Sequence, residues 1–509
     1  MKTILERDGG LESPWQHGLP SMVSPRPKKI TETVYDCLVI GGGITGFTTA
    51  LLLQKSGKNV ILAEANSIGF GTTGGTSAHI NNFADTTYKE AENAFGKQGA
   101  KLFAKAISEG FAIIKDNIAE YKIDCEYEDK VAYVYAEDDK QAEQLTSLYT
   151  GLTMVGIRAH FVKELPVPIP YKNAIKLNGQ AQFHPLKYLQ GLQKHFLASG
   201  GNFVEHTLIN KINTENEVHM AASDQMTIHA KNIVYATHMP PNINVLNLEC
   251  APYRSYVLGV KLKDDNHPDA LVYDLEDPYH YFRTHTIDGE KLLIAGGNDH
   301  KTGHEEPDKV FGDLEKYVRK YFNVSSIKYR WSSQYYIPVD GLPYIGQMPL
   351  ATKGIYCATG FNGNGMMLGS IAGKIINDLI VKENSVYKDL FDPCRTKPID
   401  GFKEFVTENS DVALHWVKDR IGIHETDSLK RLAPGTGKIV EVNGKKVAAY
   451  RDENGTIHAL NPVCTHMKCV VNWNPEEKSW DCPCHGARFD IDGKVLTGPA
   501  TINLAQIQQ

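Results

Sequence analysis

Hydrophobic positions between residues 35 and 64 fall into two short runs separated by a longer mixed segment. The first run, residues 37–40, reads Cys-Leu-Val-Ile, and the second, residues 59–63, has Val-Ile-Leu-Ala after one polar residue. Four consecutive apolar residues are too few for a buried helix and are typical of a strand covered on both faces of a parallel sheet. Residues 47–56 lie between the runs and predict a helix, so the stretch reads as strand, helix and strand.

A glycine-rich turn joins the first strand to the helix. From Gly41 to Gly46 the sequence is Gly-Gly-Gly-Ile-Thr-Gly, which has the spacing G-x-G-x-x-G. In a dinucleotide-binding turn Gly41 permits the tight turn, Gly43 lets N–H groups approach a pyrophosphate, and Gly46 lets the helix pack closely. Glu64 ends the second strand, where its carboxylate can accept hydrogen bonds from a ribose 2′-OH. An ordinary glycine-rich turn is the alternative, but the strands and the acid together favour a dinucleotide site.

Small residues and hydroxyl groups are concentrated in the next segment, residues 69–79. A loop of this composition can lie against a flavin and its phosphates, although a solvent-exposed loop is the alternative; its candidate binding residues are Thr72, Thr73, Ser77 and His79. Glycine returns at residues 358–365, before a helix expected over residues 366–380. The N–H groups behind Gly363 and Gly365 would point at the occupant of the first turn and stabilise negative charge there.

Hydrophobic spacing of three and four residues predicts a helix over residues 87–120, and further helices are expected over residues 138–155 and 183–199. Between about 250 and 335 the pattern changes to alternation, which predicts strands. A strand over residues 231–237 would close the nucleotide-binding sheet. The order predicts an α/β Rossmann-like domain with a mixed β-sheet (α+β) substrate domain, built mainly from residues 85–180 and 250–335.

Composition limits the classes of partner. The chain has 509 residues, 42% of them hydrophobic and 22% charged, with a formal net charge of -6. This length predicts two or three domains, and nothing in the charge suggests a nucleic-acid partner. No apolar run approaches the roughly 20 residues that span a bilayer, so no transmembrane segment is expected. Residues 1–34 are polar, contain Pro20, Pro25 and Pro27, and are interpreted as an N-terminal extension rather than a signal peptide or anchor.

The nine cysteines divide into two groups. Five are scattered along the chain, whereas four fall between residues 464 and 484. Scattered cysteines are typical of a reducing compartment, which points to the cytoplasm. The four clustered cysteines share two short segments with His466 and His485, and 15 residues separate His466 from Cys482. Two thiolates and two imidazoles suit a tetrahedral zinc site equally well, but the additional cysteine in each segment favours an iron-sulfur site.

Residues 35–380 resemble the D-amino-acid-oxidase-like family of flavoproteins. The match rests on the G-x-G-x-x-G turn with Glu64, on Asp-Gly-Leu-Pro-x-x-Gly at residues 340–346, and on Gly-x-Gly at residues 363–365. The resemblance implies FAD rather than NAD. It also implies a small amine or amino-acid substrate whose hydride passes to the flavin.

The chain departs from this family where the substrate would bind. In amino-acid-specific members, an Arg often binds the substrate carboxylate. This Arg lies five residues before the aspartate that matches Asp340, and here that position is Tyr335. The candidate catalytic residues are therefore Tyr335, Arg283 and Arg254, and each arginine is equally expected to be a surface or packing residue. The resemblance also places His79 near a histidine that some members link covalently to the flavin.

Residues 426–504 are similar to the Rieske 2Fe-2S domain, a small all-β fold. This resemblance implies that Cys464 and Cys482 hold one iron, that His466 and His485 hold the other, and that Cys469 and Cys484 form a disulfide between the two ligand loops.

High-potential Rieske domains have a Ser directly after the second ligand segment and a Tyr two residues later. Here these positions are Ala487 and Phe489, so two hydrogen-bond donors to the cluster are missing. The resemblance therefore implies a lower potential and a ferredoxin-like electron acceptor.

The expected organisation is an N-terminal extension (1–34), a D-amino-acid-oxidase-like domain (35–383), a linker with a helix (384–425) and a Rieske domain (426–509). A flavin takes two electrons from a C–N bond, whereas a Rieske cluster takes one. Two such centres predict a dehydrogenase that passes electrons from FAD through the 2Fe-2S cluster to an external acceptor. The alternative is an electron-transfer, reductase or redox-sensing module without amine-oxidising activity.

Overall fold

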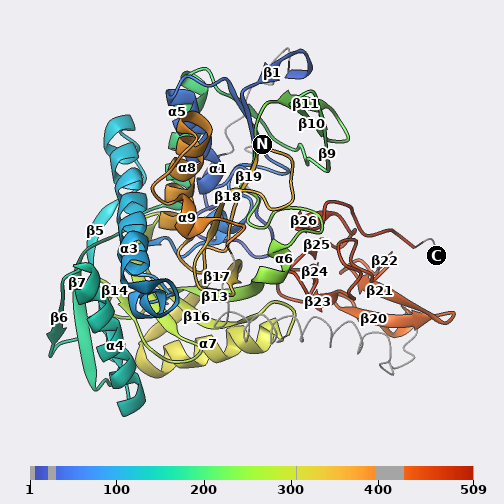
Figure 1. Cartoon of the computed structure of the whole chain (residues 1–509). Helices are drawn as coiled ribbons and strands as arrows, with labels where there is room; N and C mark the ends of the chain where they lie inside the picture. The colour runs from blue at the N-terminus through green and yellow to red at the C-terminus, as the bar shows by residue number, and fades with distance from the viewer. Residues whose placement is uncertain (1–5, 21–29, 305, 396–428, 508–509) are drawn as a thin grey trace.

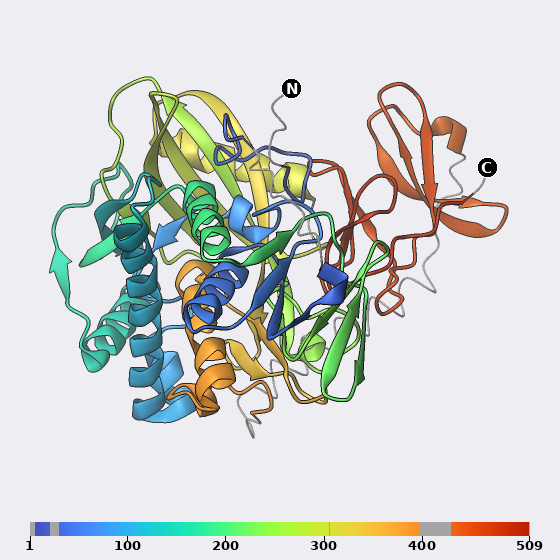
Figure 2. The same cartoon turned by 90° about the horizontal axis from the view of Figure 1, so that it is seen from above.

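The structure is a computed structural model that describes residues 6–20, 30–304, 306–395 and 429–507. The helix expected within the linker, from about residue 400 to 420, lies outside these residues. Figures 1 and 2 show the C-terminal domain against one side of a larger body formed by the described residues between 30 and 395. In the described part of the chain, no helix is long and apolar enough to cross a membrane.

A six-stranded sheet forms the nucleotide-binding domain. Its strands, in spatial order, are β18 (Tyr344–Gln347), β19 (Ile355–Thr359), β12 (Ile233–Tyr235), β2 (Cys37–Ile40), β3 (Val60–Ala63) and β8 (Asn202–Val204). All neighbours are parallel except β18 and β19. Helix α1 (Ile44–Lys55) links β2 to β3, and it begins directly after Gly43, three residues earlier than expected.

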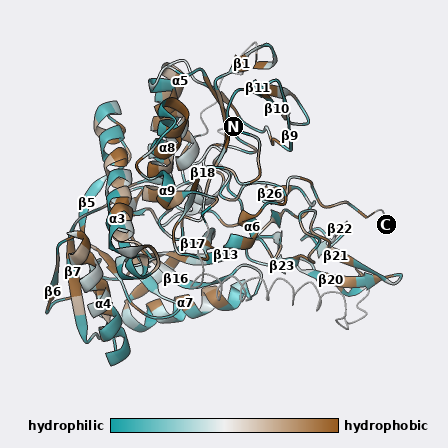
Figure 3. Cartoon of the chain, in the orientation of Figure 1, coloured by the Kyte–Doolittle hydropathy of each residue, from teal (hydrophilic) through white to brown (hydrophobic). Residues whose placement is uncertain are grey.

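The alternation of side chains along β2 explains how both faces of this sheet are covered. Cys37 and Val39 belong to a core shared with α1 and with α8 (Gly365–Lys382), whereas Leu38 and Ile40 face a second core. A four-stranded sheet covers that second face, with the order β1 (Val34–Tyr35), β11 (Thr227–Ala230), β10 (Val218–Ala222) and β9 (Lys211–Glu215). Helix α8 is largely hydrophobic in Figure 3, as its burial requires.

A nine-stranded mixed sheet forms the second layer. Its order is β17 (Val324–Pro338), β13 (Cys250–Leu262), β16 (Glu290–Lys301), β15 (His280–Ile287), β14 (Leu271–Tyr273), β5 (Glu128–Ala136), β7 (Asn173–Gln182) and β4 (His79–Ile80), with β6 (Ala159–Val162) also paired to β7. Only β14 and β5 are parallel among these strand pairs.

Helix α7 (Pro307–Tyr321) was not expected, because residues 250–335 were interpreted as strands. It packs on β13 and β16 through Val310, Leu314 and Val318, which recur every four residues. The remaining helices are α2 (Thr72–Gly75), α3 (Tyr88–Tyr121), α4 (Asp139–Val155), α5 (Pro185–Ala198), α6 (Leu246–Glu249) and α9 (Lys388–Phe391), with 3₁₀ turns at Ile30–Glu32 and Leu429–Arg431.

The C-terminal domain consists of two small antiparallel sheets. One contains β20 (Gly437–Val442), β21 (Lys445–Arg451) and β22 (Ile457–Leu460), and the other contains β23 (Asn472–Asn474), β24 (Ser479–Asp481), β25 (Arg488–Phe489) and β26 (Val495–Thr497). The expected fold class, an α/β domain with a mixed sheet and an all-β C-terminal domain, is confirmed.

Residues 6–20 of the N-terminal extension lie against the larger body. Trp15 is fully buried, and its indole N–H donates to the carbonyl oxygen of Thr76 at 2.7 Å. The hydroxyl of Ser13 donates to the carbonyl oxygen of Gly74 at 2.8 Å. This segment therefore holds the loop around α2 in place.

Candidate functional site

The glycine turn has the conformation that its sequence predicts. Gly41 has φ +114°, and a Cβ there would lie 2.4 Å from the carbonyl oxygen of Ala236. At Gly46 a Cβ would lie 1.8 Å from the carbonyl oxygen of Gly41, so only glycine lets α1 approach β2 this closely. The Glu64 carboxylate accepts from the N–H of Gly42 at 2.6 Å and from that of Asn66 at 2.8 Å. Burial raises the pKa of Glu64 above its usual value.

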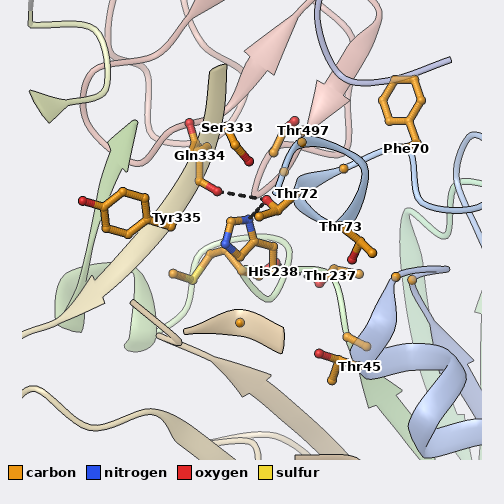
Figure 4. A pocket seen from close by; sticks show the side chains of 18 of the residues that line it. Thr45, Phe70, Thr72, Thr73, Thr237, His238, Ser333, Gln334, Tyr335 and Thr497 are labelled. Atoms are coloured by element: carbon orange, nitrogen blue, oxygen red, sulfur yellow. Dashed lines mark hydrogen bonds between the residues drawn. The ribbon is translucent and has the colours of Figure 1, made fainter. Parts of the chain in front are cut away.

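A large pocket opens from this turn. Eight of the expected cofactor-binding residues line this pocket: Gly41, Gly43, Glu64, Thr72, Thr73, Ser77, Gly363 and Gly365. Figure 4 shows Thr45 and Thr73 from the glycine-turn side of the pocket, facing Ser333, Gln334 and Tyr335 of β17. The N–H of Gly363 donates to the carboxylate of Asp85 at 2.7 Å, and α8 begins at Gly365.

The side chain of His79 is not part of the pocket lining. It is buried on β4 between Tyr273 and Tyr281, with ring centroids 5.4 and 5.3 Å away, and Nδ1 is 2.9 Å from the hydroxyl of Ser77. Burial lowers the pKa of His79 well below its usual value, and the charge of Arg283 adds to this shift.

The two candidate arginines are fully buried and contact protein groups. Arg283 donates to the carbonyl oxygens of Ser77 and Ala78 at 3.0 and 2.7 Å, so it supports the loop after α2. Arg254 donates to the hydroxyl of Ser332 at 2.9 Å and lies 3.8 Å from the Glu477 carboxylate of the C-terminal domain. The described residues that line the pocket include neither arginine.

Tyr335 does line the pocket, and it has a partner that the sequence did not indicate. Its hydroxyl donates to Oδ2 of Asp299 at 2.8 Å. Asp299 is on β16, in a segment that was interpreted only as a strand. Burial raises the pKa of Asp299 to about 7, opposed by the hydroxyls of Ser255 and Tyr335.

His238 was also missed, because it follows a short strand without a motif. Its Nδ1 lies 3.1 Å from the hydroxyl of Thr72, which in turn donates to the carbonyl oxygen of Gln334 at 2.9 Å (Figure 4). Burial lowers the pKa of His238 to about 4, so the imidazole is neutral at pH 7. Its ring centroid lies 4.7 Å from that of Tyr336.

The four expected metal ligands converge in the C-terminal domain. The imidazoles of His466 and His485 lie 5.0 Å apart between centroids, and the thiols of Cys464 and Cys482 share a hydrogen bond that lowers the pKa of Cys464. Nδ1 of His466 and both ring nitrogens of His485 are buried without a partner among the described residues. Buried donors and acceptors are normally satisfied, so this set of unpaired nitrogens beside two thiols fits an iron-sulfur cluster.

The remaining two clustered cysteines form a disulfide, as the resemblance implied. Cys469 and Cys484 are joined, with their Cα atoms 6.6 Å apart. The Sγ atom of Cys482 lies within 4.8 Å of both disulfide sulfurs. The disulfide therefore ties the two ligand loops together beside a ligand thiol.

The ligand loops contact the wall of the pocket directly. The hydroxyl of Tyr336 donates to the carbonyl oxygen of His485 at 3.0 Å. The side-chain amide of Gln334 donates to the carbonyl oxygen of Gly486 at 3.0 Å. His466 donates from Nε2 to the carbonyl oxygen of Asn242 at 3.3 Å. Residues 495–498 and 500–501 of the C-terminal domain also line the pocket, and Figure 4 shows Thr497 on that side.

A buried network of charges fixes the C-terminal domain at this position. Glu477 accepts from Arg7 of the N-terminal segment, and Arg488 pairs with Asp8 at 3.1 Å and with Asp481 at 3.1 Å. The side chains are at most 4% exposed, so each charge depends on its partners.

Comparisons with known proteins agree with this architecture. A model of the FAD dependent oxidoreductase family matches residues 36–379, and a model of the Rieske [2Fe-2S] domain matches residues 423–508. Because the first match covers more than half of the chain, the chain belongs to the family of FAD-dependent oxidoreductases of the D-amino-acid-oxidase type. It also carries a C-terminal Rieske domain. FAD and a 2Fe-2S cluster are therefore its cofactors, and the glycine turn and the four ligands fit them.

Three relatives illustrate the match. The chain is 34% identical over 479 residues to YhfW of Bacillus subtilis (strain 168), a protein named only provisionally as a Rieske 2Fe-2S iron-sulfur protein, and the match covers 94% of each chain. It is 25% identical to gamma-glutamylputrescine oxidoreductase of Escherichia coli (strain K12), over 68% of this chain and 83% of the relative. Glycine oxidase from Geobacillus kaustophilus has the same fold, with a TM-score of 0.57, 18% identity, and coverage of 71% of this chain and 99% of that one.

Proposed function

We propose that this enzyme is a dehydrogenase that oxidises a C–N bond of a small amine or amino acid. FAD would accept the two electrons, and the Rieske cluster would pass them singly to an external acceptor. The proposal rests on the observation that one strand, β17, contacts both the pocket and the loop that would hold the cluster. Ser333, Gln334 and Tyr335 line the pocket, while Gln334 and Tyr336 hold the loop that contains the ligand His485.

The relatives support the substrate class. The name of the Escherichia coli relative specifies an amine derivative, and the name of the Geobacillus kaustophilus structure specifies an amino acid. At the pocket wall opposite the glycine turn, Tyr335 and Asp299 offer a hydrogen-bonded pair to a small polar substrate.

The residues around the cluster are suited to electron transfer rather than to ligand exchange. Cys464, Cys482 and His485 are at most 2% exposed, so water is excluded from the ligand set. Because Ala487 and Phe489 supply no hydroxyl groups, a low-potential, ferredoxin-like acceptor is the preferred partner. The buried, unpaired thiols of Cys37, Cys125, Cys250 and Cys357 support a cytoplasmic location.

The test mixes purified protein anaerobically with a panel of amines and amino acids, and records flavin absorbance and the electron-paramagnetic signal of the reduced cluster. A substrate should bleach the flavin and generate the cluster signal. His485→Ala should retain flavin bleaching and lose both the cluster signal and the reduction of an added one-electron acceptor. The control is His458→Ala, because His458 is outside the ligand loops and contacts Asp492.

Two results would count against the proposal. If no amine or amino acid bleaches the flavin, the chain is an electron-transfer or redox-sensing module. If His485→Ala reduces the one-electron acceptor as fast as the unmodified protein, the cluster is not the relay.

A further inference from the structure

Asp299 faces the pocket because of an irregularity in its strand. On β13, Arg254 pairs with His300 and Tyr256 pairs with Gly297 of β16, so Ser255 alone stands opposite Asn298 and Asp299. Two residues opposite one constitute a β-bulge, which reverses the alternation of side chains beyond it.

The contacts on either side of the bulge confirm this reversal. Before it, Leu293 and Ala295 pack in the core beneath α7. After it, Asn298 is on the α7 side, where its amide donates to the carbonyl oxygen of Val310 at 3.3 Å. Asp299 consequently points to the opposite face, together with pocket residues such as Val257. Without the bulge, the carboxylate would lie against the apolar core under α7.

The Asp299 carboxylate lacks both a full set of hydrogen bonds and a counter-charge among the described residues. Oδ2 accepts from Tyr335, and the Ser255 hydroxyl is close enough to lower the pKa of the group, but Oδ1 is shielded from solvent and has no hydrogen-bond partner among the described residues. No described Lys or Arg lies within 4.0 Å of Asp299 as an ion-pair partner. A carboxylate that is removed from water without a counter-charge is destabilised.

The described pocket lining has no positively charged side chain to pair with a substrate carboxylate. Its described residues include no Lys or Arg, its imidazole, His238, is neutral, and its acids are Glu64 at the glycine turn and Asp299. Around Asp299 the lining is aromatic, with Tyr279, Tyr281 and Tyr335. Aromatic faces and a carboxylate attract cations.

We propose that Asp299 binds the ammonium group of the substrate, and that the substrate is a cationic amine without an α-carboxylate. This inference rests on the proposed function and narrows its substrate class. The bulge supplies the acid, Tyr335 orients it, and the absence of a basic side chain in the described lining disfavours α-amino acids.

The experiment compares pairs of compounds that differ by one carboxylate: butylamine and norvaline, putrescine and ornithine. Binding to the FAD-loaded full chain is measured by titration calorimetry at pH 8.5, and flavin bleaching is measured in parallel. The amine of each pair should bind about tenfold to a hundredfold more tightly, because the carboxylate of norvaline or ornithine would leave water without a cation to pair with. 1-Butanol, which has no charge, should bind weakly.

Asp299→Asn should weaken amine binding about tenfold to a hundredfold, as expected for the loss of a charge-assisted hydrogen bond, whereas Asp265→Asn, at an exposed aspartate, should leave it unchanged. If Asp299→Asn is purified without flavin, the unmodified protein still provides a test. Its affinity for butylamine should rise as the pH increases from 6 to 8.5, because Asp299 ionises while the amine stays protonated. The other titratable groups whose charges act on Asp299 are Asp85, His280 and the three tyrosines, with His280 on the α7 side of the sheet.

The outcomes separate this inference from the proposed function. If norvaline or ornithine bleaches the flavin and its decarboxylated partner does not, the inference is overturned and the dehydrogenase proposal stands. Equal affinity of Asp299→Asn and the unmodified protein for the amines would also overturn it. If the amines bind through Asp299 but bleach no flavin, the binding inference stands and the proposed oxidation fails.

Discussion

The hydroxyl of Tyr336 donates a hydrogen bond to the carbonyl oxygen of His485, an expected cluster ligand, with 3.0 Å between the oxygens. Tyr336 follows Tyr335, which lines the cofactor pocket, and its ring contacts His238. Two consecutive residues of β17 therefore contact the two redox sites from opposite sides of one strand. Strand β17 therefore joins the pocket directly to the loop that would hold the cluster.

Tyr336→Phe tests the contribution of this hydrogen bond. The buried carbonyl oxygen of His485 loses its donor, so the free energy of unfolding should fall by about 1–3 kcal/mol. The g-values of the reduced cluster should shift as well, because the orientation of the ligand loop changes. The matched control is Tyr188→Phe, since the Tyr188 hydroxyl accepts one hydrogen bond from Asn117 at 3.0 Å. The control should lose stability and keep the same g-values; an unchanged cluster signal in Tyr336→Phe would contradict the prediction.

The buried charges at the domain interface predict a strong effect of Glu477→Gln. Burial opposes ionisation of Glu477, but Arg7, Arg254 and Arg488 hold its pKa below the usual value. Removing one partner of a buried network costs roughly 3–5 kcal/mol, measured by denaturant unfolding at pH 7. Glu290→Gln, at a partly exposed acid paired with Lys261 and Lys328, should cost less than about 1 kcal/mol.

The pH dependence of the Glu477→Gln effect follows from the direction of the pKa shift. A carboxylate with a lowered folded-state pKa stabilises the fold above its unfolded value, here 4.5, and this stabilisation is lost as the pH falls through the folded value. The difference between Glu477→Gln and the unmodified protein should therefore shrink below pH 4. A constant difference down to pH 3 would exclude an electrostatic cause.

Asp299→Asn should have the opposite pH dependence. The folded-state pKa of Asp299 is raised to about 7 from 3.8, so the ionised carboxylate destabilises the fold, and the native state loses stability as the pH rises between these values. Substrate-free Asp299→Asn should be more stable than the unmodified protein by about 1–3 kcal/mol at pH 8.5, and equally stable near pH 4. Thermal unfolding at both pH values checks this, and a variant that is less stable at pH 8.5 would contradict it.

Much of this architecture follows from local sequence. The strand, glycine turn and terminal acid of the first 30 residues of the nucleotide-binding domain have fixed spacing, and so do the two ligand segments around Cys464 and Cys482. Backbone conformation and metal coordination each require particular residues at particular separations. Such requirements can be recognised from the amino-acid sequence alone.

The missed features depend on contacts between distant segments. Asp299 faces the pocket only because β13 and β16 pair with a bulge, and a bulge depends on both strands. Trp15 is buried by a loop more than 50 residues away. Arg254 was a candidate substrate ligand, with a packing role equally expected, and its ion-pair partner Glu477 is in another domain. The ion pair, the bulge and the buried N-terminal segment each depend on a residue far away in the sequence, so a local pattern cannot predict them.

The cluster potential is set by residues that pack against the ligand loops. Ala487 and Phe489 are fully buried in the same core as Cys464 and Cys482, and the N–H of Cys482 donates to the carbonyl oxygen of Ala487 at 2.8 Å. Hydroxyl groups at these positions would donate to cluster or cysteine sulfur and stabilise the reduced state. The natural side chains offer a methyl group and a phenyl ring, so the reduced state lacks this stabilisation.

Ala487→Ser combined with Phe489→Tyr should therefore raise the potential of the cluster. Each charge-assisted hydrogen bond is worth about 1.5–3 kcal/mol, or about 65–130 mV for one electron if it acts wholly on the reduced form. Redox titration of the full chain, followed by the electron-paramagnetic signal, measures the shift. Ala449→Ser is the control, because Ala449 is buried in a separate core with Val440 and Val447. Rieske centres span about -150 to +300 mV, so a natural potential already near +300 mV, or no rise in the double variant, would show that other donors dominate this cluster.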